Sequence, residues 1–107
     1  MNTRDLKEKI ADSQYEISLH AEKERYAEDI SILDLENALI NGELIEDYPN
    51  DPRGSSCLIL GYSSDRAIHI VCGFTSTGWL RIITVYLPKL PKWLDARTRR
   101  SKDNDDA

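Results

Sequence analysis

The stretch that most constrains the fold of this chain is residues 66–87, which read RAIHIVCGFTSTGWLRIITVYL. β-Branched and aromatic residues dominate both arms of this stretch, and the polar run at 75–78 interrupts them. Such a pattern predicts two antiparallel strands joined by a short turn. Because apolar residues are concentrated here, the other elements are expected to pack against this hairpin.

The side chains of the two arms can be assigned to faces once the turn is placed. If Phe74 and Trp79 close a four-residue loop, the opposed pairs are Cys72 with Arg81, Ile70 with Ile83, and His69 with Thr84. Side chains alternate along a strand, so one face is expected to carry Ile68, Ile70, Cys72, Phe74, Trp79, Ile83 and Val85, with Arg81 near its edge. The other face is expected to carry His69, Val71, Leu80, Ile82, Thr84 and Tyr86. A loop longer or shorter by one residue would place His69 and Arg81 on one face instead.

Three helices are expected before the hairpin. Residues 5–12 carry Leu6 and Ile10 four positions apart, which is typical of a short amphipathic helix. A second helix is expected from Ser18, as its N-cap, to about residue 28. Ser31 and Asp34 fit a capping box and predict a third helix, which the Asn-Gly pair at 41–42 should end.

Two further strands are expected at 44–48 and 57–62. With the hairpin they make four strands joined by short connections, which favour antiparallel pairing. The predicted fold class is therefore α+β, with N-terminal helices packed on one face of a four-stranded antiparallel sheet. Residues 15–18 alternate in polarity and are expected to form a short extended segment. Trp93 is expected to anchor the segment that leaves the last strand.

Length and charge indicate one domain with a distinct end. A chain of 107 residues suits a single domain, expected here at residues 1–96, followed by a charged tail at 97–107 that is expected to be disordered. Residues 1–96 hold ten Lys or Arg and sixteen Asp or Glu, and the whole chain has a net charge of −5. An acidic body disfavours non-specific binding of nucleic acid, which depends on contacts between cations and phosphates.

The sequence lacks the patterns of several other classes of protein. No apolar run reaches the roughly 20 residues of a membrane helix, and the N-terminus lacks the apolar core of a signal peptide, so a cytoplasmic protein without membrane contact is expected. Cys57 and Cys72 lie in apolar, strand-like settings and are expected to be buried thiols. Closely spaced zinc ligands, a Gly-rich phosphate loop and a nucleophile elbow are all missing, so neither a metal nor a cofactor is expected.

Six short segments together resemble a widespread family of small prokaryotic proteins catalogued as a domain of unknown function. The segments are 17–21 (ISLHA), 29–31 (DIS), 41–49 (NGELIEDYP), 56–61 (SCLILG), 68–71 (IHIV) and 83–86 (ITVY). The resemblance covers residues 15–93, and the family is similar to the RelE/ParE-like toxins, some members being encoded beside zinc-finger antitoxins. It therefore implies a RelE-like two-layer fold and a type II toxin, acting as a metal-independent mRNA endoribonuclease with an antitoxin as its protein partner.

Cleavage of RNA without a metal needs three groups. A base takes the proton of the 2′-hydroxyl, a cation stabilises the charge of the phosphorane, and an acid protonates the leaving oxygen. His20 could be the base or the acid, because an imidazole titrates near neutral pH. Arg25 or Arg81 could hold the phosphate. His69 and Tyr86, on one face of the predicted hairpin, could serve as the acid and as an orienting group.

Each of these five candidates also has a purely structural role open to it. His20 could pack on the sheet and bond to a strand backbone, and His69 could be a satisfied core residue between two isoleucines. Tyr86 could simply pack at the end of its strand. Arg81 and Arg25 could pair with the many carboxylates of the chain. Only their convergence in one cleft would favour catalysis.

Two features depart from what a RelE-like ribonuclease should carry. Such toxins are usually basic, whereas this chain is acidic. Many relatives have an arginine four residues after the helix histidine, where this chain has Glu24 and its nearest arginine is Arg25. Both features favour an alternative function, a catalytically inactive interaction or dimerisation domain of the same fold. An exposed strand edge, at 44–48 or 57–62, would then be its docking site.

Overall fold

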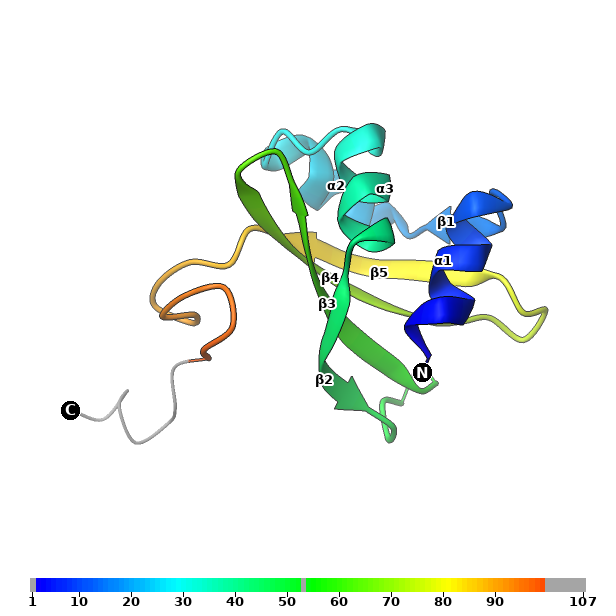
Figure 1. Ribbon diagram of the computed structural model, residues 1–107. Coiled ribbons are helices and arrows are strands. Elements are labelled where there is room, and N and C mark those ends of the chain that lie inside the picture. Colours follow the sequence, from blue (N-terminus) through cyan, green and yellow to red (C-terminus); the bar gives the residue numbers. More distant parts are fainter. Residues whose placement is uncertain (1, 53, 100–107) are drawn as a thin grey trace.

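Three helices lie over one face of a five-stranded sheet in the described part of the chain (Figure 1). The computed structural model describes residues 2–52 and 54–99. In chain order the elements are α1 (Thr3–Ala11), β1 (Tyr15–Ile17), α2 (Leu19–Ala27), α3 (Ile32–Ile40), β2 (Glu43–Tyr48), β3 (Ser56–Ser63), β4 (Arg66–Phe74) and β5 (Leu80–Tyr86). The predicted α+β class and the three predicted helices are confirmed.

The sheet contains one strand more than predicted. Its strand order is β1-β5-β4-β3-β2, and β1 pairs with β5 in parallel, with Tyr15 opposite Leu80 and Ile17 opposite Ile82. The prediction of four antiparallel strands is therefore wrong, because the sheet has five strands and one parallel pair. The extended segment expected at residues 15–18 contains β1, but its place in the sheet could not be predicted, because its partner comes from the far end of the folded sequence.

The predicted register of the β4–β5 hairpin is also wrong. Phe74 lies opposite Leu80, so the connecting loop spans residues 75–79 and is one residue longer than predicted. A β-bulge then inserts Ile83 into β5, because Cys72 pairs with Ile82 while the preceding Val71 pairs with Thr84. Such a bulge places two residues of one strand opposite one of its partner.

This bulge decides which side chains of β5 reach the core. Leu80, Ile82 and Val85 are all fully buried, although simple alternation would place Val85 on the face opposite to the other two. The predicted register puts Phe74 and Trp79 on one face with Ile70 and other apolar residues, but these two side chains are 40% and 43% exposed. The extra residue resets the alternation, so that both halves of the strand present apolar side chains to the helices.

The core lies between the helices and the sheet. Its fully buried members include Leu6, Ile10, Ala21, Leu35, Ala38, Leu39, Ile59, Ile68, Ile70, Ile82 and Val85. Cys57 and Cys72 belong to it as well, directly opposite each other on β3 and β4. Both thiols are buried and neither is in a disulfide, which confirms the prediction for them.

Both predicted N-caps are confirmed. The hydroxyl of Ser18 accepts the backbone N–H of Ala21 at 3.0 Å, so Ser18 is the N-cap of α2. Ser31 and Asp34 form the capping box that begins α3. Asp34 also accepts hydrogen bonds from Ser63 at 2.7 Å and from Arg66 at 3.0 Å. The bond from Ser63, together with those from Ser31, lowers the pKa of the Asp34 carboxyl to about 2. This carboxylate therefore ties α3 to the β3–β4 turn.

Helix α3 approaches β3 so closely that only glycine fits beneath it. A Cβ atom built on Gly61 would lie 1.8 Å from the carbonyl oxygen of Ala38. At the end of the helix, the side chain of Asn41 donates to the carbonyl of Tyr62 at 2.7 Å and accepts its N–H at 2.9 Å. The helix end thus occupies the edge of β3 that β2 leaves unpaired.

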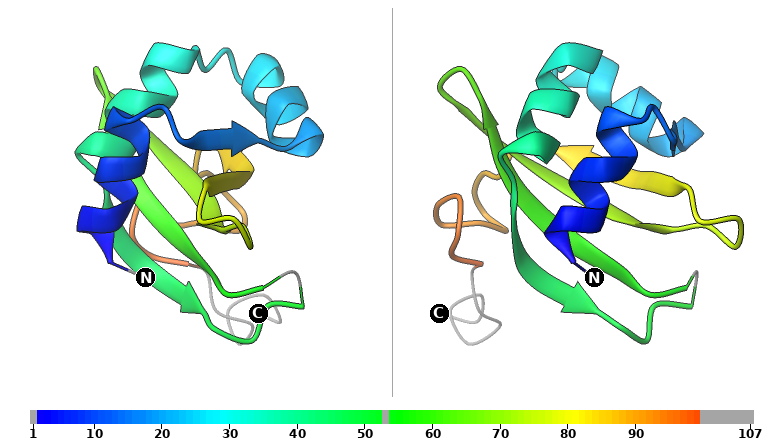
Figure 2. Two further views of the ribbon diagram at one scale, coloured as in Figure 1. Left: turned by 90° about the vertical axis from the view of Figure 1, so that its right-hand side faces the viewer. Right: turned by 45° about the vertical axis from the view of Figure 1, so that its right-hand side comes forward.

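Residues 88–99 form a segment, here called the C-terminal strap, that lies across the face of the sheet opposite the helices (Figure 2). Trp93 is 2% exposed and packs against His69, so the predicted anchoring role of Trp93 is confirmed. Arg97 and Arg99 form ion pairs with Glu43 and Glu46 of β2. Of the predicted disordered tail, residues 97–99 therefore contact the sheet, and residues 100–107 lie outside the described residues.

Candidate functional site

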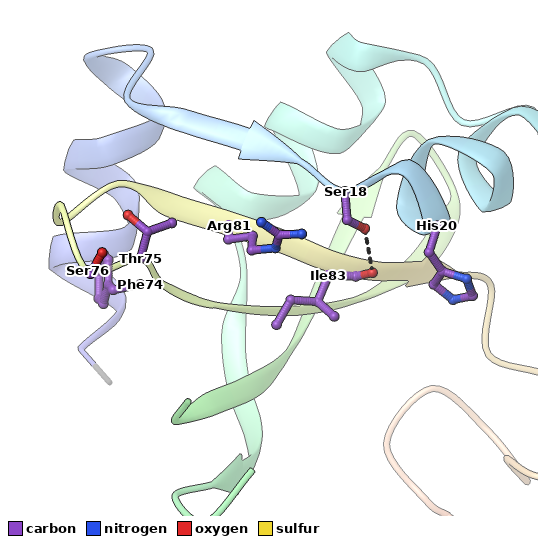
Figure 3. Close-up of a pocket in the computed structure, with 7 residues that line it drawn as sticks. All are labelled: Ser18, His20, Phe74, Thr75, Ser76, Arg81 and Ile83. Carbon is purple, nitrogen blue, oxygen red and sulfur yellow. Dashed lines mark hydrogen bonds between the residues drawn. The ribbon is translucent and has the colours of Figure 1, made fainter. Parts of the chain in front are cut away.

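An open pocket of about 500 Å³ lies between the start of α2 and the β4–β5 loop (Figure 3). Its lining residues are Ser18, His20, Phe74, Thr75, Ser76, Arg81 and Ile83. Phe74, Thr75 and Ser76 stand at the loop end, His20 stands at the helix end, and Arg81 and Ile83 lie between them (Figure 3). The pocket therefore combines one aromatic ring, several hydroxyls, an imidazole and a guanidinium.

The short β1 strand is what places a helix at this pocket. Because β1 ends at Ile17, it does not pair with β5 beyond Ile82, and the next residue, Ser18, forms the hydrogen bonds to that part of the β5 edge. The Ser18 N–H donates to the carbonyl of Ile82 at 2.9 Å, and its hydroxyl donates to the carbonyl of Ile83 at 3.0 Å. One serine thus caps α2 and holds it on the bulged part of β5. The first turn of the helix, with His20, is fixed above the strand as a result.

His20 is held by a carboxylate that is itself fixed to the sheet. Its Nε2 atom lies 3.2 Å from Oε1 of Glu24, one turn further along α2, and the imidazole side chain is 68% exposed. The same oxygen of Glu24 accepts the backbone N–H of Val85 at 3.0 Å. An imidazole oriented by a carboxylate and open to solvent is the arrangement expected of a general base.

Arg81 is the cation of the pocket. Its guanidinium donates to Glu16 across the β1–β5 pair at 3.1 Å, and both side chains are about half exposed, at 52% and 48%. An exposed pair of this kind contributes little to stability, so a phosphate could replace the carboxylate at small cost. A guanidinium also suits a phosphate because it can donate two parallel hydrogen bonds.

His69 and Tyr86 form a separate cluster beneath the C-terminal strap. They lie opposite each other on β4 and β5, so they share one face of the sheet, as predicted. The carbonyl of Ala96 can only accept, so Nε2 of His69 donates to it, at 2.7 Å. Nδ1 then accepts from the Tyr86 hydroxyl at 3.2 Å. Both ring nitrogens are occupied and the side chain is fully buried, so this imidazole is closed to a substrate in the described structure.

The surroundings of His69 keep it neutral. Burial lowers the pKa of its imidazole, and the nearby Arg99 acts in the same direction, while the bond to Ala96 and the charge of Glu46 oppose this. Burial likewise raises the pKa of the Tyr86 hydroxyl. The indole N–H of Trp93 lies beside this hydroxyl and lowers its pKa, although it does not form a full hydrogen bond. The cluster is therefore built around a neutral imidazole.

We expect the domain to lose stability as the pH falls below about 6.5, the ordinary pKa of histidine. In that range the unfolded chain binds a proton at His69, while the folded chain, with its lowered pKa, does not. Urea unfolding at pH 7.5 and at pH 5.5 should give a smaller free energy of unfolding at the lower pH. A His69→Gln variant should lose part of this difference, and an unchanged difference would contradict the assignment.

Arg25 lies away from both places. It is 7% exposed, donates to Glu22 at 2.6 Å and to the carbonyl of Ile30 at 3.0 Å, and stacks over Tyr26. The hydrogen bond with Glu22 raises the pKa of this guanidinium, against the effect of burial. These contacts hold the loop that connects α2 to α3, so Arg25 has a structural role.

The five predicted site residues are thus distributed over three places. His20 and Arg81 line the pocket, His69 and Tyr86 share the cluster beneath the strap, and Arg25 lies between two helices. Sequence reasoning missed further residues of the pocket region, namely Ser18, Glu24, Phe74, Thr75, Ser76 and Ile83. Two of these carried a signal, since Ser18 is a recognisable N-cap and Glu24 follows His20 by one helical turn.

Within residues 2–52 and 54–99, no group of three His, Cys, Asp or Glu side chains is arranged to hold a metal ion. In the same segments, no helix has both the length and the apolar character needed to cross a membrane.

The fold and the pocket define a small α+β domain with a polar pocket at the junction of a helix and a sheet edge. The sequence profile of the family described as "Domain of unknown function (DUF4258)" matches residues 17–87, and the chain belongs to this family. The matched segment contains every lining residue of the pocket. Comparisons with curated proteins and with solved structures find no match.

Proposed function

We propose that this domain is a type II toxin-like endoribonuclease that cleaves RNA without a metal ion at the pocket between α2 and the β4–β5 loop. The observation that carries this proposal is that His20 and Arg81, one candidate base and one candidate phosphate ligand, line the same pocket. The resemblance to RelE/ParE-like toxins supplies the class of substrate. His69, Tyr86 and Arg25 are given structural roles in this proposal.

In the proposed reaction His20 takes the proton of a ribose 2′-hydroxyl. The freed 2′-oxygen attacks the adjacent phosphorus, and the bond from phosphorus to the 5′-oxygen of the next nucleotide breaks. The products are a 2′,3′-cyclic phosphate and a 5′-hydroxyl, whose proton comes from the water that reaches this open pocket. Arg81 stabilises the negative charge that gathers on the phosphoryl oxygens in the transition state. Glu24 keeps the ring of His20 in place.

The acidic body of the protein is compatible with this proposal if a few local contacts provide the affinity. Glu16 is the carboxylate that partners Arg81, so bound phosphate has to displace it. We therefore expect weak binding that falls further as salt rises, because among the residues that the structure describes, one guanidinium and one imidazole line the pocket.

The purified chain is expected to cleave single-stranded RNA in the presence of excess EDTA, leaving 2′,3′-cyclic phosphate and 5′-hydroxyl ends. Mass spectrometry of the products distinguishes these ends from those of metal-dependent nucleases. Induced expression should also slow growth and shorten transcripts, and co-expression of an antitoxin should relieve both effects. RNA that stays intact in the test tube, together with unaffected growth, would overturn the proposal.

A second candidate function is a protein-interaction or dimerisation domain, and the position of β2 favours it. β2 is the last strand of the sheet, so its outer edge is unpaired within the described residues. An unpaired edge can accept a strand from a partner or from a second copy of the chain. The predicted alternative edge at 57–62 is wrong, because β3 is paired with both β2 and β4. A strictly monomeric mass in solution, with no partner retained in a pull-down, would argue against this candidate.

A further inference from the structure

We infer that the loop end of the pocket is a stacking site for the base of an unpaired nucleotide, with Phe74 as its platform. This inference rests on the proposed function and deepens it, because it names the side chain that binds a base of the substrate.

Phe74 lines the pocket with an aromatic ring that is partly accessible to solvent. It is the last residue of β4 and lines the pocket, yet 40% of the residue remains exposed. An exposed aromatic ring offers a surface on which any base can stack, and such stacking does not depend on sequence. The neighbouring hydroxyls of Thr75 and Ser76 provide polar groups at the edge of the same site.

The loop that carries this platform is held in one shape. Thr75 donates its N–H to the carbonyl of Trp79 at 2.7 Å, and its hydroxyl accepts the N–H of Trp79 at 3.1 Å. Gly78 supplies the positive φ of 88° that the turn requires, and its N–H bonds to the carbonyl of Thr75 at 3.0 Å. A loop fixed in this way presents Phe74 without a large cost of ordering on binding.

The order of groups along the pocket matches the order of groups across two linked nucleotides. Arg81 lies between Phe74 at one end and His20 at the other (Figure 3). If the base on Phe74 belongs to the nucleotide that follows the scissile bond, its 5′-phosphodiester lies near Arg81 and the 2′-hydroxyl of the preceding ribose lies toward His20. A base inside a duplex is already stacked and paired, so it cannot reach a side chain in this position. The site therefore favours a nucleotide from a single strand or a loop.

The test measures binding of a fluorescently labelled, unstructured RNA oligonucleotide by anisotropy, in a His20→Gln background that prevents cleavage. Phe74→Ala should weaken binding about 5- to 100-fold, the range found when a stacking aromatic is removed, whereas Phe74→Trp should retain it. Trp79→Ala is the matched control, because Trp79 belongs to the same loop and is equally exposed, at 43%, but does not line the pocket. It should change the affinity by less than about twofold, a small effect for a residue without base contact.

A duplex of the same sequence should bind more weakly than the single strand. Equal affinities of the Phe74→Ala and Trp79→Ala variants, or a preference for the duplex, would overturn the stacking site. If the unsubstituted pocket cleaves RNA while Phe74→Ala behaves like the control, only the stacking site fails. If the chain with an intact pocket neither binds nor cleaves RNA, the proposed function fails with it.

Discussion

Replacement of Gly61 by alanine is expected to lower the free energy of unfolding by roughly 3–5 kcal/mol, the upper range for overpacking in a core. The added Cβ atom would lie 1.8 Å from the carbonyl oxygen of Ala38, 2.5 Å from its carbonyl carbon and 2.7 Å from its Cα atom. All three are backbone atoms of α3, so no side-chain rotation can relieve the contact. Either the helix moves away from the sheet or β3 is displaced.

Two controls separate this contact from other effects of glycine replacement. Gly54 has a φ of 101° but nothing within 4 Å of a built Cβ, so Gly54→Ala should cost only the roughly 1–2 kcal/mol of a left-handed alanine. Ala38→Gly combined with Gly61→Ala should give no rescue, because the obstructing atoms remain. Urea denaturation measures all three variants. A Gly61→Ala variant within about 1 kcal/mol of the parent would show that α3 is not seated on β3 as described.

Replacement of His20 by glutamine is expected to lower the rate of RNA cleavage about 10²- to 10⁴-fold, the usual contribution of a general base. The side chain is 68% exposed, so the fold should be affected little. Affinity for RNA should also change little, because Arg81 and Phe74 remain in the pocket. A variant with unchanged kcat would mean that another group takes the proton.

Neighbouring residues of α2 provide the controls for this measurement. Lys23→Gln changes an exposed side chain one turn further along the helix, outside the pocket lining, and should leave the rate unchanged. Glu24→Gln should lower the rate less than His20→Gln does, because the amide could still accept the N–H of Val85 and would only weaken the contact that orients His20.

The helical half of this fold could be predicted because its signals are local. Ser18, Ser31 and Asp34 cap their helices through bonds within a single turn, and the spacing of Leu6 and Ile10 marks the buried side of α1. The strands β2 to β5 could be located for a similar reason, since runs of β-branched residues are bounded by turn residues.

The pairing of β1 and the course of the hairpin could not be predicted, because they depend on contacts between distant residues. The three residues of β1 form a strand only because they pair with the edge of β5, and no feature of the neighbouring sequence indicates this partner. The length of the 75–79 loop and the bulge at Ile83 follow from which apolar side chains fit beneath the helices, and a period of two alone does not reveal this.

The candidate site was predictable only in part for the same reason. The residue types that RNA cleavage needs selected five side chains, but similar side chains also serve as ordinary structural groups. Arg25 is held by Glu22 and Ile30, and His69 is enclosed by the strap, which the sequence shows only as a few apolar residues around two prolines. Which candidates meet depends on the parallel β1–β5 pair.

Ile83, the bulged residue of β5, contributes to the pocket, while its neighbours on the strand fill the core. If Ile83 were deleted, strict alternation would return, and Leu80, Ile82 and Val85 would still point toward the helices. What would disappear is the carbonyl that receives the hydroxyl of Ser18, which is one of the bonds that hold α2 at the rim of the pocket. Position 83 is thus a place where relatives could gain or lose one residue, altering activity while the architecture survives.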